Sequence, residues 1–241
     1  MGTDVVLVVA ALGFAVVNGV NDGGALVATG LKVPSLPPFV AIAMLGAAIV
    51  VAPLVVGTQV ATTLATRLVS FSDDGALVSG ETGLLVAVLT AVAVVGFLSS
   101  RGLPTSLTLA LVGGITGAGL GGGLPVSHAT LVLVLAVGLA APVVGAGAGF
   151  ALSRFAGLLP SRRPVGRRVR TTHVGAFALQ CLAYAGNDGQ KMFAVMAVAT
   201  GGAQEVRLPL AEVALLALLF TVGLVVGLRP AAGTLSAEIV P

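Results

Sequence analysis

The sequence predicts an all-α integral membrane protein with about seven transmembrane or re-entrant segments. Three observations predict this class: the composition, a series of long apolar runs, and a polar motif that occurs in two of those runs. Of the 241 residues, 57% are hydrophobic and only 9% are charged, and the mean hydropathy is +1.11. Soluble domains usually carry about a quarter charged residues. So little polar surface cannot cover so apolar a chain in water, and a lipid bilayer is the expected solvent.

The apolar runs define the expected segments. A bilayer core of ~30 Å is crossed by about 20 helical residues. The fourth run is rich in glycine and contains Pro104, so it either crosses the membrane or turns back as a re-entrant hairpin. In chain order the runs cover residues 5–20 with a continuation to 31, 38–64, 82–99, 103–120, 129–152, 172–200 and 208–228.

The basic residues predict the orientation of the chain and its division into parts. Half of the twelve Lys and Arg residues lie between Arg154 and Arg170. The positive-inside rule makes this stretch a cytoplasmic loop, and the N-terminus then lies outside if every run crosses once. We expect a first transmembrane repeat over residues 1–153, the basic loop over 154–170, and a partial second repeat over 171–241. Because the basic charge is confined to a loop, no nucleic-acid partner is predicted.

An Asn-Asp-Gly motif occurs twice. Asn21-Asp22-Gly23 lies in the first run and Asn187-Asp188-Gly189 in the sixth. Each copy follows a small-residue lead-in and precedes an apolar run. In the predicted topology these two runs cross the membrane in opposite directions. The sequence therefore predicts a transporter built from inverted repeats.

The motif also predicts a binding site. A carboxylate inside a membrane segment costs at least ~2.5 kcal/mol, so Asp22 and Asp188 are expected to face a polar site. The adjacent glycines favour an unwound turn, so we expect both helices to be broken there. Oxygens of Asn21, Asp22, Asn187 and Asp188 would then bind a coupling Na⁺, or an aspartate would carry a proton. The restarted helix would offer N–H groups to an anion. The alternative is a plain turn between two helices.

Further polar residues lie near these motifs. Gln190 and Lys191 follow the second copy. Lys191 either neutralises Asp188, meets an anionic substrate, or extends its ammonium to the membrane interface. Ser106 and Thr108 open a glycine-rich helix, where they either cradle an oxyanion or allow close helix packing. The sequence contains no Walker A, GxSxG or HExxH pattern, so neither an enzyme nor a cofactor is predicted, and no metal beyond Na⁺.

These motifs resemble those of the inorganic phosphate transporter (PiT) family. Residues 18–29 and 186–191 resemble its paired motifs, Gly-Ala-Asn-Asp and Asn-Asp-Ala-Gln-Lys, and residues 102–110 resemble its Gly-Leu-Pro-Val-Ser-Ser-Thr-His-Ala hairpin. The likeness covers most of the chain in order and spacing. It implies a multi-pass symporter in the cell membrane that moves inorganic phosphate with Na⁺ or H⁺, with the substrate near the bilayer midplane.

The resemblance also implies which residues form the sites. Asn21, Asp22, Asn187 and Asp188 would serve both the substrate and the cation. Thr105 and Thr58 are weaker candidates. The substrate site as a whole would comprise Asn21, Asp22, Ser106, Thr108, Asn187, Asp188, Gln190 and Lys191.

Several positions depart from the family pattern. Ala25 stands where the family has a second asparagine, and Tyr184 replaces a histidine. Leu107 and Leu109 replace the serine and histidine of the hairpin, and Pro241 comes before a second hairpin. The second repeat is therefore expected to be incomplete, which suits a truncated chain, a split transporter, a homodimer that shares elements, or a non-functional remnant. The alternatives to phosphate symport are a permease for sulfate or another oxyanion, and a non-transporting or partner-dependent membrane subunit.

Overall fold

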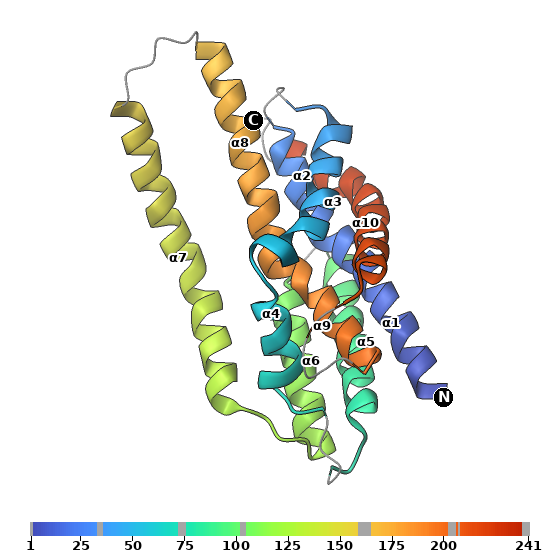
Figure 1. Ribbon diagram of the computed structural model, residues 1–241. Helices are drawn as coiled ribbons and strands as arrows, with labels where there is room; N and C mark the ends of the chain where they lie inside the picture. The colour runs from blue at the N-terminus through green and yellow to red at the C-terminus, as the bar shows by residue number, and fades with distance from the viewer. Residues whose placement is uncertain are drawn as a thin grey trace.

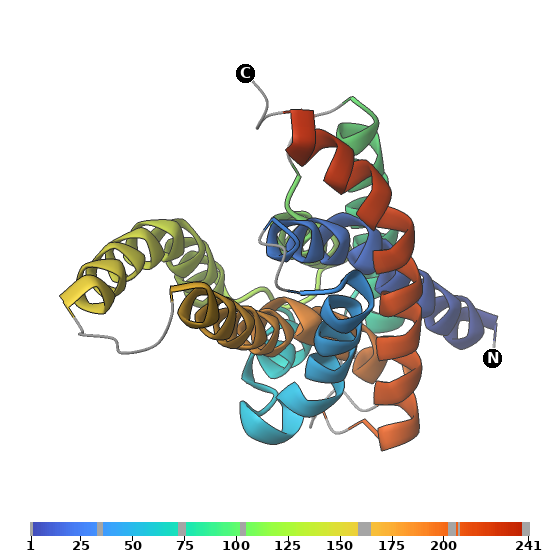
Figure 2. The same cartoon turned by 90° about the horizontal axis from the view of Figure 1, so that it is seen from above.

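The computed structural model describes residues 2–32, 36–71, 76–101, 105–158, 165–201, 206 and 208–237 (Figures 1 and 2). These residues are helical apart from turns and one isolated bridge between Val69 and Val126. The predicted all-α membrane class is confirmed, because several helices are long and apolar enough to cross a bilayer. The five that meet this description are Val5–Gly30, Pro38–Val55, Gly80–Ser99, His128–Ala156 and Leu210–Arg229.

The first and sixth predicted segments are continuous helices, each with a π-turn at its Asn-Asp motif. The first consists of α1 (Gly2–Asn18), η1 (Gly19–Gly23) and α2 (Gly24–Gly30). The sixth consists of α8 (Val165–Tyr184), η3 (Ala185–Gly189) and α9 (Gln190–Ala199).

The prediction of broken helices at the two motifs is wrong. Residues on both sides of each π-turn keep right-handed helical angles, and the Gly24 N–H donates to the Gly19 carbonyl oxygen. A π-turn inserts one residue while keeping the backbone hydrogen-bonded inside the helix. In a membrane this avoids the free N–H and C=O groups that an unwound segment would expose.

The glycines of the first motif allow close helix packing instead of unwinding. The partner helix is α10 (Leu210–Ala237), which crosses the first helix (Figure 2). A Cβ on Gly19 would lie 2.0 Å from the Phe220 carbonyl oxygen. On α10, a Cβ on Gly223 would lie 2.0 Å from the Val16 carbonyl oxygen. Small residues on both helices therefore let the two backbones touch, a common way for membrane helices to associate.

The second predicted run, 38–64, is helical but not continuous. It forms α3 (Pro38–Val55), a turn in which Gly57 has φ +79°, α4 (Gln59–Thr62) and η2 (Thr63–Arg67). The positive φ favours glycine, because a Cβ would be strained there.

The third and fourth runs form the hairpin α5 (Gly80–Ser100) and α6 (Leu107–Gly122), whose helices lie side by side (Figure 1). Ser79 and Ser106 accept hydrogen bonds from backbone N–H groups in the first turns of these helices, as N-caps do. The turn between them contacts η1 in the middle of the first helix, through Thr105. The predicted orientation assumed a full crossing here and stays a prediction. Residues 102–104 of the predicted hairpin motif lie outside the described residues.

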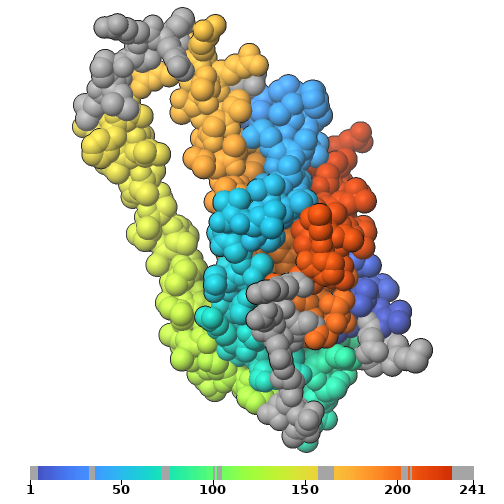
Figure 3. Space-filling model, in the orientation of Figure 1, coloured from blue at the N-terminus to red at the C-terminus, as the bar shows by residue number. Residues whose placement is uncertain are grey.

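Helix α7 (His128–Leu158) stands apart from the other helices (Figures 1 and 3). None of the residues in its most apolar window is buried. Helices α7 and α8 extend into the basic stretch predicted as a loop, so only residues 159–164 separate them, and these lie outside the described residues. The predicted division of the chain into two repeats stays a prediction.

Candidate substrate and cation site

The two Asn-Asp motifs meet at the side chain of Lys191. Its Nζ lies 2.8 Å from Asp188 Oδ1 and 3.5 Å from Asp22 Oδ2. Both carboxylates are therefore within ion-pair distance of one ammonium group. The sequence predicted that Asp22 and Asp188 lie close together, and these distances confirm it. Their functional roles stay predictions.

Lys191 is buried and fully engaged. Its side chain is only 1% exposed, which excludes the alternative that its ammonium reaches the membrane interface. Nζ also donates to Thr108 Oγ1 at 2.6 Å, and the Thr108 hydroxyl in turn donates to Asp188 Oδ1 at 2.9 Å. An ammonium has three N–H groups, and each of these three has an oxygen within reach. Hydrogen bonds to charged groups are the stronger kind, so this cluster fixes α9 against α6.

Asn21 connects Asp22 to the hairpin. Its Nδ2 donates to Asp22 Oδ1 at 2.6 Å, and its Oδ1 accepts from Thr105 Oγ1 at 2.8 Å. Thr105, a weaker candidate in the sequence, is thus part of the cluster. The neighbouring Ser106 is exposed, and its hydroxyl accepts a hydrogen bond of 3.3 Å from the Leu109 N–H at the start of α6. The hairpin turn therefore presents hydroxyl groups beside the carboxylates.

Gln190 contacts a different part of the protein. Its Oε1 accepts from the N–H groups of Val60 at 3.0 Å and Ala61 at 3.1 Å, and its Nε2 donates to the Gly57 carbonyl at 2.6 Å. The side chain therefore holds the turn between α3 and α4, and both ends of its amide are occupied. Its predicted role as a substrate ligand stays a prediction.

Two other candidates lie outside this cluster of contacts. Thr58 lines a cavity of about 270 Å³ together with Phe193 and Val213. The Asn187 side chain is exposed.

Residues 18–180 match the Phosphate transporter family (PHO4). The chain belongs to this family. The resemblance predicted from the motifs is confirmed, and membership in a transporter family also confirms that the chain is not an enzyme.

Curated proteins that are similar to this chain are described as phosphate transporters as well. A probable low-affinity inorganic phosphate transporter of Streptomyces halstedii is 34% identical over 149 residues, which cover 61% of this chain and 68% of the relative. Its counterpart in Mycobacterium bovis is 34% identical over 202 residues, 80% of this chain and 46% of the relative. The Bacillus subtilis counterpart is 26% identical over 200 residues, 81% of this chain and 59% of the relative. The chain thus spans between about half and two thirds of these relatives. No solved structure matches it.

A second polar pair in this member of the phosphate transporter family escaped the sequence analysis. The Tyr184 hydroxyl donates to Asn18 Oδ1 at 3.4 Å. Asn18 is 0% exposed, and its Nδ2 has no hydrogen-bond partner within the described part of the chain. The two residues stand at the same offset, four positions before Asp22 and Asp188. That shared offset is the signal that identifies them.

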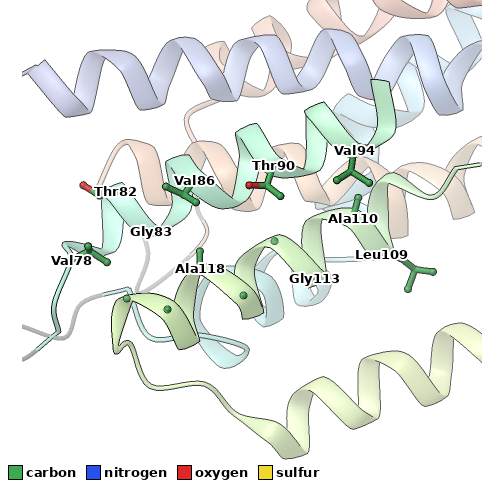
Figure 4. A pocket seen from close by; sticks show the side chains of 14 residues that line it. Val78, Thr82, Gly83, Val86, Thr90, Val94, Leu109, Ala110, Gly113 and Ala118 are labelled. Carbon is green, nitrogen blue, oxygen red and sulfur yellow. The ribbon is translucent and has the colours of Figure 1, made fainter. Parts of the chain in front are cut away.

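Two cavities border the hairpin. One of about 450 Å³ lies at its turn and is lined by Thr105, Ser106 and Leu109 among others. A larger one of about 590 Å³ lies along the groove between α5 and α6 (Figure 4). Apolar side chains and glycines dominate its lining, with the hydroxyls of Thr82 and Thr90 between them. The smaller cavity is also lined mainly by apolar side chains, but its Thr105 hydroxyl donates to Asn21, which connects the cavity to the charged cluster.

Proposed function

We propose that this chain is a secondary transporter of inorganic phosphate in the cell membrane, coupled to Na⁺ or H⁺. The observation that carries the proposal is the cluster of Asp22, Asp188 and Lys191 beside the hydroxyls of the hairpin turn. Transport substrates and coupling ions commonly bind near the middle of the membrane, where two repeats meet.

The charge of the cluster supports coupled transport. With both carboxylates ionised, the two aspartates and Lys191 carry one net negative charge. A phosphate anion entering beside them would add further negative charge in a poorly solvated region, where like charges repel strongly. A cation or a proton that enters with phosphate offsets this repulsion. Coupling is therefore a physical requirement of binding at this position.

The hairpin turn supports an oxyanion as the substrate. Ser106 and Thr108 bring hydroxyl groups to the start of α6, and a helix N-terminus favours bound anions through its N–H groups. Phosphate suits the adjacent carboxylates better than sulfate does. Monohydrogen phosphate has a proton to donate to a carboxylate, whereas sulfate at neutral pH has none. The descriptions of the relatives point to the same substrate.

We further infer that the two motif helices belong to inverted repeats. Their π-turns have the same register, because the aspartate is the fourth residue of both Gly19–Gly23 and Ala185–Gly189. Helices α1–η1–α2 and α8–η3–α9 also run in opposite directions in Figure 1, which supports the inference.

A partner-dependent membrane subunit is the second candidate function. The exposure of α7 favours it, because a helix with no buried residue in its most apolar window leaves most of its surface for lipid or for another polypeptide. That polypeptide would be a second copy of this chain or a different one that completes the second repeat.

Reconstitution into liposomes tests these proposals. We expect the purified chain to accumulate labelled phosphate when a Na⁺ or proton gradient is applied, and excess unlabelled sulfate to compete poorly. Liposomes containing Asp188→Asn serve as the control. Uptake that appears only after a second polypeptide is added would favour the subunit. Preferential uptake of sulfate would overturn the choice of phosphate.

A further inference from the structure

The ammonium of Lys191 lies where a coupling cation would be expected. Its Nζ is surrounded by Asp22 Oδ2, Asp188 Oδ1 and Thr108 Oγ1, at 3.5, 2.8 and 2.6 Å. Carboxylate and hydroxyl oxygens are the ligands that hard cations choose. We propose that Lys191 is a tethered substitute for Na⁺ at this carboxylate pair, and that removing its ammonium converts the pair into a Na⁺ site. This inference concerns the site of the proposed function and rests on it.

The carboxylate oxygens of Asp22 and Asp188 are mostly engaged already, so they cannot readily bind Na⁺ in addition to Lys191. Asp22 Oδ1 accepts from Asn21 Nδ2, Asp22 Oδ2 faces Lys191, and Asp188 Oδ1 accepts from both Thr108 and Lys191. Three of the four carboxylate oxygens are therefore engaged. Hard cations in proteins take about six oxygen ligands. A second cation at this pair would also be repelled by the ammonium, because the surroundings screen charges weakly.

The local structure holds Lys191 in this position. Asp188 precedes it by three residues, so both lie on one face of the helix that continues from η3 into α9. On one side, Gln190 is anchored by its three hydrogen bonds to residues 57–61. On the other side, Met192 and Phe193 are buried. Moving the ammonium away would leave two carboxylates without a counter-charge, which is strongly destabilising.

A stability measurement in two salts tests the inference without any transport assay. Cys181 is the sole cysteine of the sequence and is only 1% exposed, so a thiol-reactive fluorogenic dye reports unfolding. The purified chain is heated in sodium chloride and in choline chloride of equal ionic strength. The test variant is Lys191→Met. Lys32→Met is the matched control, because Lys32 is an exposed lysine at the end of α2.

Three results are expected. The wild type and Lys32→Met unfold at the same temperature in both salts. Lys191→Met unfolds at a clearly higher temperature in sodium chloride than in choline chloride. This difference disappears when Asp22→Asn and Asp188→Asn are combined with Lys191→Met. The inference is overturned if Na⁺ stabilises the wild type as much as Lys191→Met, or if Na⁺ gives Lys191→Met no advantage over choline.

A second measurement covers the case in which Lys191→Met does not fold. Binding of radioactive Na⁺ to the wild type is compared with binding to Asp188→Asn. The wild type should bind no more Na⁺ than the variant does, and binding that is lost in the variant refutes the inference. Neither measurement uses phosphate. A chain without phosphate uptake but with the expected Na⁺ response would therefore refute only the proposed function.

Discussion

Replacing Gly223 by alanine should separate two helices that now touch backbone to backbone. The new Cβ would lie 2.0 Å from the Val16 carbonyl oxygen and 2.9 Å from the Val16 carbonyl carbon, and neither atom belongs to a flexible side chain. The helices must therefore move apart. Overpacking of this kind costs about 1–3 kcal/mol. Alanine recovers about 0.5–1 kcal/mol through its higher helix propensity. The net loss should lower the unfolding temperature by several degrees, at about 2–4 °C per kcal/mol for a chain of this size.

Gly96 in α5 provides the matched control. A Cβ there meets nothing within 4 Å, so Gly96→Ala should raise the unfolding temperature through helix propensity alone. Both variants are measured by the dye reaction of Cys181 in detergent. A Gly223→Ala protein as stable as Gly96→Ala would refute the close packing of α10 on the first helix. Because η1 is part of that contact, phosphate uptake should also fall in Gly223→Ala and not in Gly96→Ala.

Three further substitutions, with one control, test the charged cluster and its surroundings. Asp188→Asn should abolish phosphate uptake while expression and folding persist, because a carboxylate of the proposed substrate and coupling site is lost; wild-type uptake by this variant would contradict that role. Gln190→Met should lower the unfolding temperature, since it removes the partner of the buried Ala61 N–H, at about 1–3 kcal/mol, and of the partly buried Val60 N–H and Gly57 C=O at a smaller cost. Thr108→Val should cost about 1–3 kcal/mol, because its hydroxyl bonds to two charged groups. Thr116→Val on the same helix should be neutral or stabilising, since the Thr116 hydroxyl is buried without a partner among the described residues. Equal losses in both threonine variants would contradict the reasoning.

The sequence predicted the helices and the convergence of the two aspartates, because both depend on local signals. Apolar runs of sufficient length form helices in lipid whatever their neighbours are. A carboxylate in such a run needs a polar partner, so two of them in one small protein are expected to share a site.

The role of the glycines could not be predicted in the same way. Low helix propensity and small size are properties of the same residue, and they predict opposite structures, a broken helix or a closely packed one. What decides for Gly19 is α10, whose contacting residues Phe220 and Leu224 lie about two hundred positions further along the chain. The contacts of Gln190 could not be predicted for the same reason. It stands next to the second motif, yet its partners Val60 and Ala61 are 130 and 129 residues away.

The π-turns have a consequence for how a site of this kind binds an anion. A helix that breaks and restarts would offer free N–H groups at the Asn-Asp motifs, whereas a continuous helix with a π-turn keeps its N–H groups in the backbone. Donors for an oxyanion must then come from elsewhere. Within the hairpin, the hydroxyls of Thr105 and Thr108 already donate to Asn21 and Asp188, whereas the exposed Ser106 hydroxyl only accepts, from the Leu109 N–H, and keeps its proton for a ligand. We therefore expect the two long helices to supply the charges that must be balanced, and the hairpin turn to supply a neutral donor for the substrate through the Ser106 hydroxyl. Substitutions in the hairpin turn should accordingly change the affinity for the anion, and substitutions at Asp22 or Asp188 should change the coupling.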